Sequence, residues 1–119
     1  MHNFKELIMW QKTRALNKQL YELTRSFPKE EIFGLTSQMR RAAISISSNI
    51  AEGCGRRTEK ELVNFLGIAS GSSTELESQC ILAADLGFLS EVKSQEIQDK
   101  IPEIQKMLTK LIDKFKATY

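Results

Sequence analysis

The stretch Ile97-Gln-Asp-Lys-Ile101-Pro-Glu-Ile104-Gln-Lys-Met-Leu108-Thr-Lys-Leu111-Ile-Asp-Lys-Phe115 decides the fold of this chain. Its large apolar residues recur at spacings of 4, 3, 4, 3 and 4, which is typical of a helix that buries one face along its whole length. A helix is predicted over about 91–117, with the Ser90 hydroxyl as its cap. Pro102 lies inside it, and forcing a helix through proline costs about 3 kcal/mol. We therefore expect a kink at Pro102 or a break just before it.

Two earlier segments carry the same helical periodicity. The first predicts a helix over about 4–27 that Pro28 stops, because proline lacks the backbone donor that a helix interior needs. The second predicts a helix over about 36–54. A hydroxyl in Leu35-Thr36-Ser37 is expected to cap its start, and Gly53-Cys54-Gly55 is expected to end it with a glycine in the left-handed conformation.

A third segment begins with a capping box, since Thr58 is followed three residues later by Glu61. It predicts a helix over about 59–86 that stops at Gly87. No run of alternating apolar and polar residues indicates a strand. The chain of 119 residues is therefore predicted to be all-α and to form one domain over 1–119, an antiparallel up-down-up-down four-helix bundle.

The residue types exclude most catalytic and metal chemistry. The single histidine is His2, close to a chain end, so a triad or a histidine-ligated zinc site has no partner to use. Cys54 and Cys80 do not form a CxxC motif and are expected to be reduced thiols. We expect no catalytic residue, no metal and no cofactor, and hence no enzyme. Without a signal-peptide pattern or a long apolar stretch, the chain is expected to be cytoplasmic and to have no membrane partner.

Charge is distributed unevenly along the chain. Residues 1–60 contain 11 Lys and Arg against 6 Asp and Glu, whereas residues 61–119 contain 6 against 9. The halves therefore carry +5 and −3, which add to the net charge of +2. No basic residue occurs between Glu61 and Val92, so the third helix is acidic. Its acidic side chains either face the arginines of the second helix or solvent, or pair with a basic surface of another subunit.

Five basic residues are candidates for phosphate contacts, because guanidinium groups match phosphate oxygens and keep their charge at physiological pH. Arg41 and Arg56 are 15 residues apart, which is about 22 Å along a continuous helix, so one copy of the chain offers two small basic spots. Repetition of these spots in an oligomer would strengthen the attraction to nucleic acid. The candidates are Arg40, Arg41, Arg56, Arg57 and Lys60.

A stripe of small side chains marks the third helix as a candidate subunit interface. Gly67, Gly71, Thr74 and Ser78 follow spacings of 4, 3 and 4, and each glycine costs about 1 kcal/mol relative to alanine inside a helix. Close approach of a neighbouring helix, from the same chain or another, explains that cost. Trp10 and Arg14 lie off the main apolar stripe of the first helix and form either a second packing face or an oligomer contact.

Several motifs make the chain resemble a known family. They are Trp10-Gln11-Lys12, Phe33-Gly34-Leu35-Thr36-Ser37-Gln38, Arg40-Arg41-Ala42, Ser48-Asn49-Ile50-Ala51-Glu52-Gly53, Gly55-Arg56-Arg57 and Leu86-Gly87. These residues closely resemble the four-helix-bundle family of the 23S ribosomal RNA intervening-sequence proteins. The resemblance covers nearly the whole chain, with departures at Ser47, where the family usually has proline, and at Pro102.

The resemblance implies a small cytosolic bacterial protein that forms a homopentamer and has no catalytic activity. It also implies relatives among the accessory variability determinant proteins of diversity-generating retroelements, which bind nucleic acid through basic surfaces. We therefore expect a pentameric ring that associates with RNA or DNA. The alternative is a protein-interaction scaffold without nucleic-acid binding, in which the same arginines form ion pairs between subunits.

Overall fold

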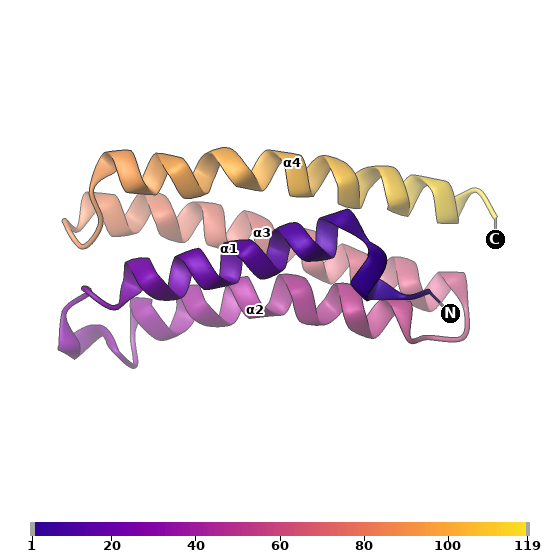
Figure 1. Cartoon of the computed structure of the whole chain (residues 1–119), viewed down its shortest axis with the longest axis horizontal. Coiled ribbons are helices and arrows are strands. Elements are labelled where there is room, and N and C mark those ends of the chain that lie inside the picture. The colour runs from indigo at the N-terminus through magenta and orange to yellow at the C-terminus, as the bar shows by residue number, and fades with distance from the viewer. Residues whose placement is uncertain (1, 119) are drawn as a thin grey trace.

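The computed structural model describes residues 2–118 as four long helices packed into a rod of 46 × 23 × 20 Å. Successive helices run in opposite directions, and both chain ends lie at the same end of the rod as the turn between α2 and α3 (Figure 1). The predicted all-α, antiparallel up-down-up-down bundle is therefore confirmed. Its elements are the short 3-10 helices η1 (Phe4–Glu6) and η2 (Lys29–Glu31) and the α-helices α1 (Ile8–Thr24), α2 (Leu35–Cys54), α3 (Glu59–Asp85) and α4 (Glu91–Lys116).

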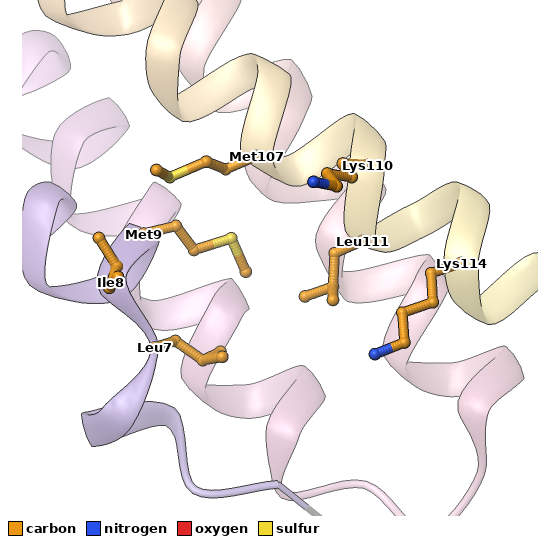
Figure 2. A pocket seen from close by; sticks show the side chains of 7 residues that line it. All are labelled: Leu7, Ile8, Met9, Met107, Lys110, Leu111 and Lys114. Carbon is orange, nitrogen blue, oxygen red and sulfur yellow. The ribbon is translucent and has the colours of Figure 1, made fainter.

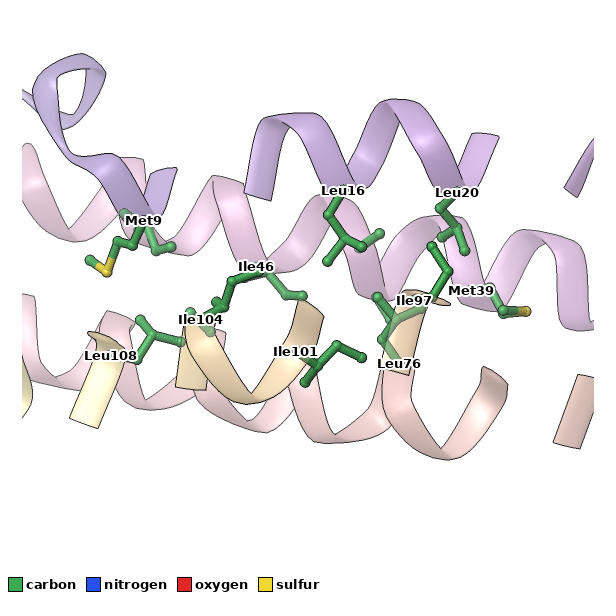
Figure 3. Packing of buried hydrophobic residues seen from close by; sticks show 14 of the residues in the cluster. Met9, Leu16, Leu20, Met39, Ile46, Leu76, Ile97, Ile101, Ile104 and Leu108 are labelled. Carbon is green, nitrogen blue, oxygen red and sulfur yellow. The ribbon is translucent and has the colours of Figure 1, made fainter. Parts of the chain in front are cut away.

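The apolar stripe of α4 lies in the core as predicted. Ile97, Ile101, Ile104 and Leu108 are at most 1% exposed, and Phe115 is buried as well. They interlock with leucine, isoleucine and methionine side chains of the other three helices (Figure 3). Burying each such side chain contributes about 1.5–3 kcal/mol, so this stripe alone gives α4 a strong reason to stay helical and docked.

The helix continues through Pro102, and the expected break before that residue is wrong. Pro102 is exposed, whereas its neighbours Ile101 and Ile104 are buried. The proline ring therefore lies on the solvent side of α4 and does not displace the side chains of the core. Burial of the flanking isoleucines offsets the local cost of the proline.

The first helix is shorter than the expected 4–27. After η1, Leu7 adopts extended backbone with φ −73° and ψ 123°, and α1 begins only at Ile8. This turn folds Phe4 back onto Trp10, with the two ring centroids 4.9 Å apart. Packing of two aromatic rings therefore replaces the first turn of the predicted helix.

Two predicted caps are confirmed, since the hydroxyl groups of Thr58 and Ser90 accept hydrogen bonds from the third backbone N–H that follows each of them. The hydroxyl cap predicted for α2 is wrong. Gly34 precedes α2, and the backbone N–H of Leu35 donates to the Oε1 of Glu31 at 3.2 Å. A carboxylate from the preceding 3-10 helix thus caps α2 in place of a local hydroxyl.

The glycine predictions are confirmed at one helix end and wrong at another. Gly87, with φ +77°, takes the left-handed backbone after α3. Gly55 has φ −85° and keeps right-handed backbone at the end of α2. Gly53 is buried inside α2, so it allows close packing of a neighbouring helix and does not end α2. Along residues 2–118, none of the helices combines the length and apolarity needed to cross a membrane.

Candidate nucleic-acid and subunit interfaces

Arg56 is committed to contacts within its own chain. Its guanidinium lies 2.7 Å from the Glu52 carboxylate and 4.0 Å from that of Glu61, and it stacks over the Phe65 ring at 4.8 Å. Two carboxylates therefore compete with any phosphate for this guanidinium group. Of the predicted phosphate contacts, Arg56 is the one most neutralised by its surroundings.

Arg57 and Lys60 remain available for an external anion. Both are exposed, and neither forms an ion pair with another of residues 2–118. They flank the turn between α2 and α3, where the end of α4 also lies because Thr118 contacts the Glu59 carboxylate. The structure therefore brings the turn close to the final residues of α4.

The last turn of α4 adds two cations that sequence reasoning did not assign to this site. Lys114 and Lys116 are exposed in the last turn of α4, and this end of α4 lies at the same end of the rod as the turn between α2 and α3 (Figure 1). The predicted antiparallel topology could have identified these two lysines, since it places the end of the fourth helix beside the turn between the second and third. Counting charge by halves of the sequence did not reveal them, because the second half is acidic as a whole.

Arg40 and Arg41 occupy different surroundings from each other. The Nε of Arg40 donates to the Oγ1 of Thr24 at 2.9 Å, and its guanidinium stacks over the Tyr21 ring at 4.5 Å. Arg41 is exposed and lines a polar groove between α2 and α3 that also contains the Glu75 carboxylate. The five predicted phosphate contacts are therefore divided among three places.

The small-residue stripe of α3 lies on the surface of the bundle, and only Thr74 at its edge contacts another helix, by accepting a hydrogen bond from the Gln105 side chain of α4 at 3.2 Å. Gly67, Gly71, Thr74 and Ser78 are all exposed. A Cβ added to Gly67 or Gly71 would meet no heavy atom from elsewhere in the chain within 4 Å. Close approach by a helix of the same chain therefore does not explain the two glycines.

Apolar side chains border that stripe. Ile68, Ile81 and Leu82 are 52%, 46% and 48% exposed, and their spacing places them beside the small residues on one side of α3. We call these seven residues, Gly67, Ile68, Gly71, Thr74, Ser78, Ile81 and Leu82, the outer α3 face. It combines apolar area with a backbone that a neighbour can approach closely.

Trp10 packs within its own chain, which agrees with the predicted second packing face of the first helix. It is half-buried against the core and carries Phe4 on one side, while the Arg14 guanidinium lies 5.9 Å from its ring centroid. Arg14 itself is exposed. The exposed part of this pair remains a candidate subunit contact.

The polar residues in the middle of α2 hold the helices together. Ser45 hydrogen bonds with Ser72 of α3 at 2.8 Å, and the side-chain amide of Asn17 in α1 donates to Ser47 at 2.8 Å. These hydroxyl groups are therefore structural links between helices.

Both thiols are buried and free. Burial raises the pKa of Cys80 to about 12, with a smaller contribution from the nearby Glu77 carboxylate, and burial also raises the pKa of Cys54. Thiols in this state are poor nucleophiles. Among the residues that the structure describes, no group of three or more His, Cys, Asp and Glu side chains could hold a metal ion.

A shallow apolar crevice of about 270 Å³ opens between the start of α1 and α4. Leu7 and Met9 face Met107 and Leu111 across it, and the ammonium groups of two α4 lysines lie along its edge (Figure 2). It exists because α1 begins late, at Ile8, while α4 continues to Lys116.

Together these features define a class of protein: a four-helix bundle whose candidate sites lie on its outer surface. One is the outer α3 face, and the other is the end of the rod that carries Arg57, Lys60, Lys114 and Lys116, which we call the basic end. The chain belongs to the 23S rRNA-intervening sequence protein family, whose model matches residues 5–110. The resemblance noted from the sequence motifs is thereby confirmed, whereas the relationship to accessory variability determinant proteins stays a prediction.

Among solved structures, the chain is similar to a protein of unknown function from the S23 ribosomal protein family of Bacteroides thetaiotaomicron. The two are 22% identical with a TM-score of 0.81, and the match covers 88% of this chain and 98% of that one. This likeness supports the four-helix fold. No curated protein matches the chain.

Proposed function

We propose that the protein acts as a non-enzymatic homo-oligomer, a ring of five copies, that associates with nucleic acid through phosphate contacts. The observation that carries this proposal is the outer α3 face, where exposed isoleucine and leucine side chains adjoin two glycines with open space at the Cβ position. The number five comes from the family resemblance. The name of the family supplies the link to ribosomal RNA.

A second copy would bring its Trp10 and Arg14 surface against the outer α3 face. The exposed Arg14 suits the exposed carboxylate of Glu75 beside that face, and the glycines let the partner's helix approach. Because the two surfaces are different, the contact is head-to-tail and closes into a ring when the rotation per copy is right. Burial of the exposed isoleucines and leucine drives the association.

The nucleic-acid contacts would centre on Arg57 and Lys60, with Lys114 and Lys116 beside them at the basic end. A few cations on one copy bind weakly, but a ring repeats them, and each added phosphate contact releases further counterions. Such contacts fix position without reading base sequence. Arg41 and Arg56 contribute less because each lies beside a carboxylate of its own chain, and Arg40 contributes less because it lies away from the basic end, beside the connector between α1 and α2.

Light scattering at micromolar concentration tests the assembly. We expect a mass five times the 13.6 kDa of one chain, and the variant Ile81→Asp should reduce it to that of a single copy with unchanged helical circular dichroism. Val92→Asp is the matched control, since Val92 is also exposed but lies in the first turn of α4. A wild-type mass equal to one chain would refute the ring.

Binding to a structured RNA, measured across salt concentrations, tests the proposed nucleic-acid contacts. Affinity should fall steeply as salt rises, and Arg57→Ser/Lys60→Ser should flatten the log–log slope by about 1 for each lost contact. Lys18→Ser/Lys93→Ser removes the same charge elsewhere and should leave the slope nearly unchanged. A salt-independent signal would contradict phosphate binding.

A protein-interaction scaffold is the second candidate, and the connector between α1 and α2 favours it. Phe33 is 93% exposed there and Ile32 is 49% exposed, which is unusual for large apolar side chains. On this hypothesis RNA affinity is negligible at every salt concentration. The arginines then form ion pairs between subunits, and Arg57→Ser/Lys60→Ser lowers the oligomer mass.

A further inference from the structure

A cavity of about 440 Å³ lies where the end of α1, the connector through η2 and the start of α2 meet. Its volume falls within the range of about 300–1,000 Å³ that is typical of small-ligand sites. Phe27 and Ile32 give it an apolar wall. The cavity lies at the end of the rod opposite the basic end described above (Figure 1).

Three cationic side chains line this cavity: Arg25, Lys29 and Arg40. Its lining within residues 2–118 includes no carboxylate. Arg25 and Lys29 are exposed and form no ion pair in the part of the chain that the structure describes. The nearby Glu31 carboxylate is engaged with the backbone N–H of Leu35. Among the residues that line the cavity, no carboxylate offsets the charge of these three cations.

Arg40 is held in place before any ligand arrives. Its Nε donates to the Thr24 hydroxyl at 2.9 Å and its Nη2 to the Tyr21 carbonyl at 3.5 Å, and its Cζ lies 4.5 Å from the centroid of the Tyr21 ring. A guanidinium fixed through one edge keeps its other N–H groups for an anion. Such preorganisation lowers the entropy cost of binding.

Thr36 supplies an independent sign that a polar partner belongs here. It lines the cavity and is 3% exposed, yet its Oγ1 has no hydrogen-bond partner. Buried hydroxyl groups are nearly always paired, so an unpaired one calls for an explanation. It lies in the first turn of α2, beside the cations of the cavity.

We propose that this cavity binds an organic phosphomonoester, with the phosphate between Arg25, Lys29, Arg40 and Thr36 and the organic part along Phe27 and Ile32. Phosphate fits better than carboxylate, because a phosphomonoester carries a charge of about −1.5 to −2 and three acceptor oxygens, which three cations and a hydroxyl can match. The site is separate from the basic end and goes beyond the proposed function. Its phosphate is a terminal group, not the backbone of a polynucleotide.

Calorimetric titration of the full chain with adenosine 5′-monophosphate tests this site. We expect saturable binding, with adenosine at least tenfold weaker and inorganic phosphate intermediate. Arg25→Ser/Lys29→Ser should weaken binding at least tenfold. Arg57→Ser/Lys60→Ser, which removes the same charge from the basic end, should leave it unchanged, so this site and the proposed nucleic-acid contacts fail or succeed separately.

Thr36→Val provides a variant that is expected to fold. It should lower the affinity for the nucleotide several-fold while raising the thermal stability of the unliganded protein, because it deletes a buried hydroxyl without a partner. Equal binding of adenosine and its monophosphate, or unchanged binding by Arg25→Ser/Lys29→Ser, would overturn the proposal. So would the absence of any binding.

The source of the phosphate is decided with trinucleotides. If a 5′-phosphorylated trinucleotide binds as tightly as the monophosphate, the site accepts the 5′ end of an RNA. If it binds at least tenfold more weakly, the site is restricted to free nucleotides. A 5′-hydroxyl trinucleotide that binds as tightly as its phosphorylated form would contradict recognition of a phosphomonoester.

Discussion

Gly53 of α2 packs directly against Leu62 of α3: a Cβ on Gly53 would lie 3.0 Å from the Cδ1 of Leu62. The same Cβ would lie 3.0 Å from the Cβ of Phe65 and 3.3 Å from the carbonyl oxygen of Leu62. Two of these atoms are fixed by the backbone of α3 and cannot turn away. The glycine therefore sets how closely α2 and α3 approach near their connecting turn.

Gly53→Ala is expected to destabilise the protein by up to about 2 kcal/mol. Overpacking costs about 1–3 kcal/mol, and the gain in helix propensity returns at most about 1 kcal/mol. Urea denaturation followed by circular dichroism measures the difference. An alanine variant as stable as the wild type would show that α3 shifts away easily.

Gly67→Ala and Gly71→Ala are matched controls with the opposite expected sign. Both glycines lie inside α3 with open space at the Cβ position. Each alanine should therefore stabilise the single chain by about 0.5–1 kcal/mol. If copies associate through the outer α3 face, the same substitutions should lower the oligomer mass in light scattering. Stabilisation with an unchanged oligomer would place the contact elsewhere.

The sequence predicted the fold well because its signals are local. The spacing of the α4 isoleucines, the Thr58 cap and the left-handed Gly87 each depend on a few neighbouring residues. The cap of α2 depends on Glu31 folding back from η2, and the shortened α1 depends on Phe4 reaching Trp10. These outcomes are decided by tertiary contacts, which periodicity does not contain.

The candidate sites were predictable only in part for the same reason. The sequence identifies Arg56 as a cation, but only the structure shows two carboxylates beside it. Arg25 and Lys29 carry no motif and lie on different elements, so nothing in the sequence places them around the buried Thr36 hydroxyl. The cluster arises from the bend of the chain at Pro28.

Pro102→Ala is expected to stabilise the protein by about 2 kcal/mol. Proline inside a helix is about 3 kcal/mol less favourable than alanine. Alanine also gives the unfolded chain more conformational freedom, which lowers the gain in stability by about 0.4–1 kcal/mol. The new N–H can donate to the carbonyl of Gln98, one turn earlier. Thermal and urea denaturation should both show the gain. No gain would mean that α4 is already strained at this turn for another reason.

Thr36→Val and Thr13→Val should change stability in opposite directions. Thr36 has no hydrogen-bond partner, whereas the Thr13 hydroxyl donates to the carbonyl of Trp10 at 2.7 Å. Removing an unpaired buried hydroxyl should stabilise the unliganded protein by about 1 kcal/mol, and removing a paired one should destabilise it by about 1 kcal/mol. Both threonines are at most 3% exposed, so burial is matched. Equal effects would argue that an undetected partner satisfies Thr36.

Cys80 should make the protein less stable at high pH. Burial raises the pKa of its thiol from 9.0 to about 12, so between these values the unfolded chain releases a proton that the folded chain retains. Stability is fully present below pH 9 and falls as pH rises, by about 1.4 kcal/mol for each pH unit from this group. Comparison of urea denaturation at pH 8 and pH 10.5 for the wild type and Cys80→Ala isolates the thiol, because the other titrating groups are common to both. The alanine variant will be less stable at pH 8 through lost packing, but its stability should decline less with pH. Parallel pH profiles would show that the folded thiol ionises as readily as the unfolded one.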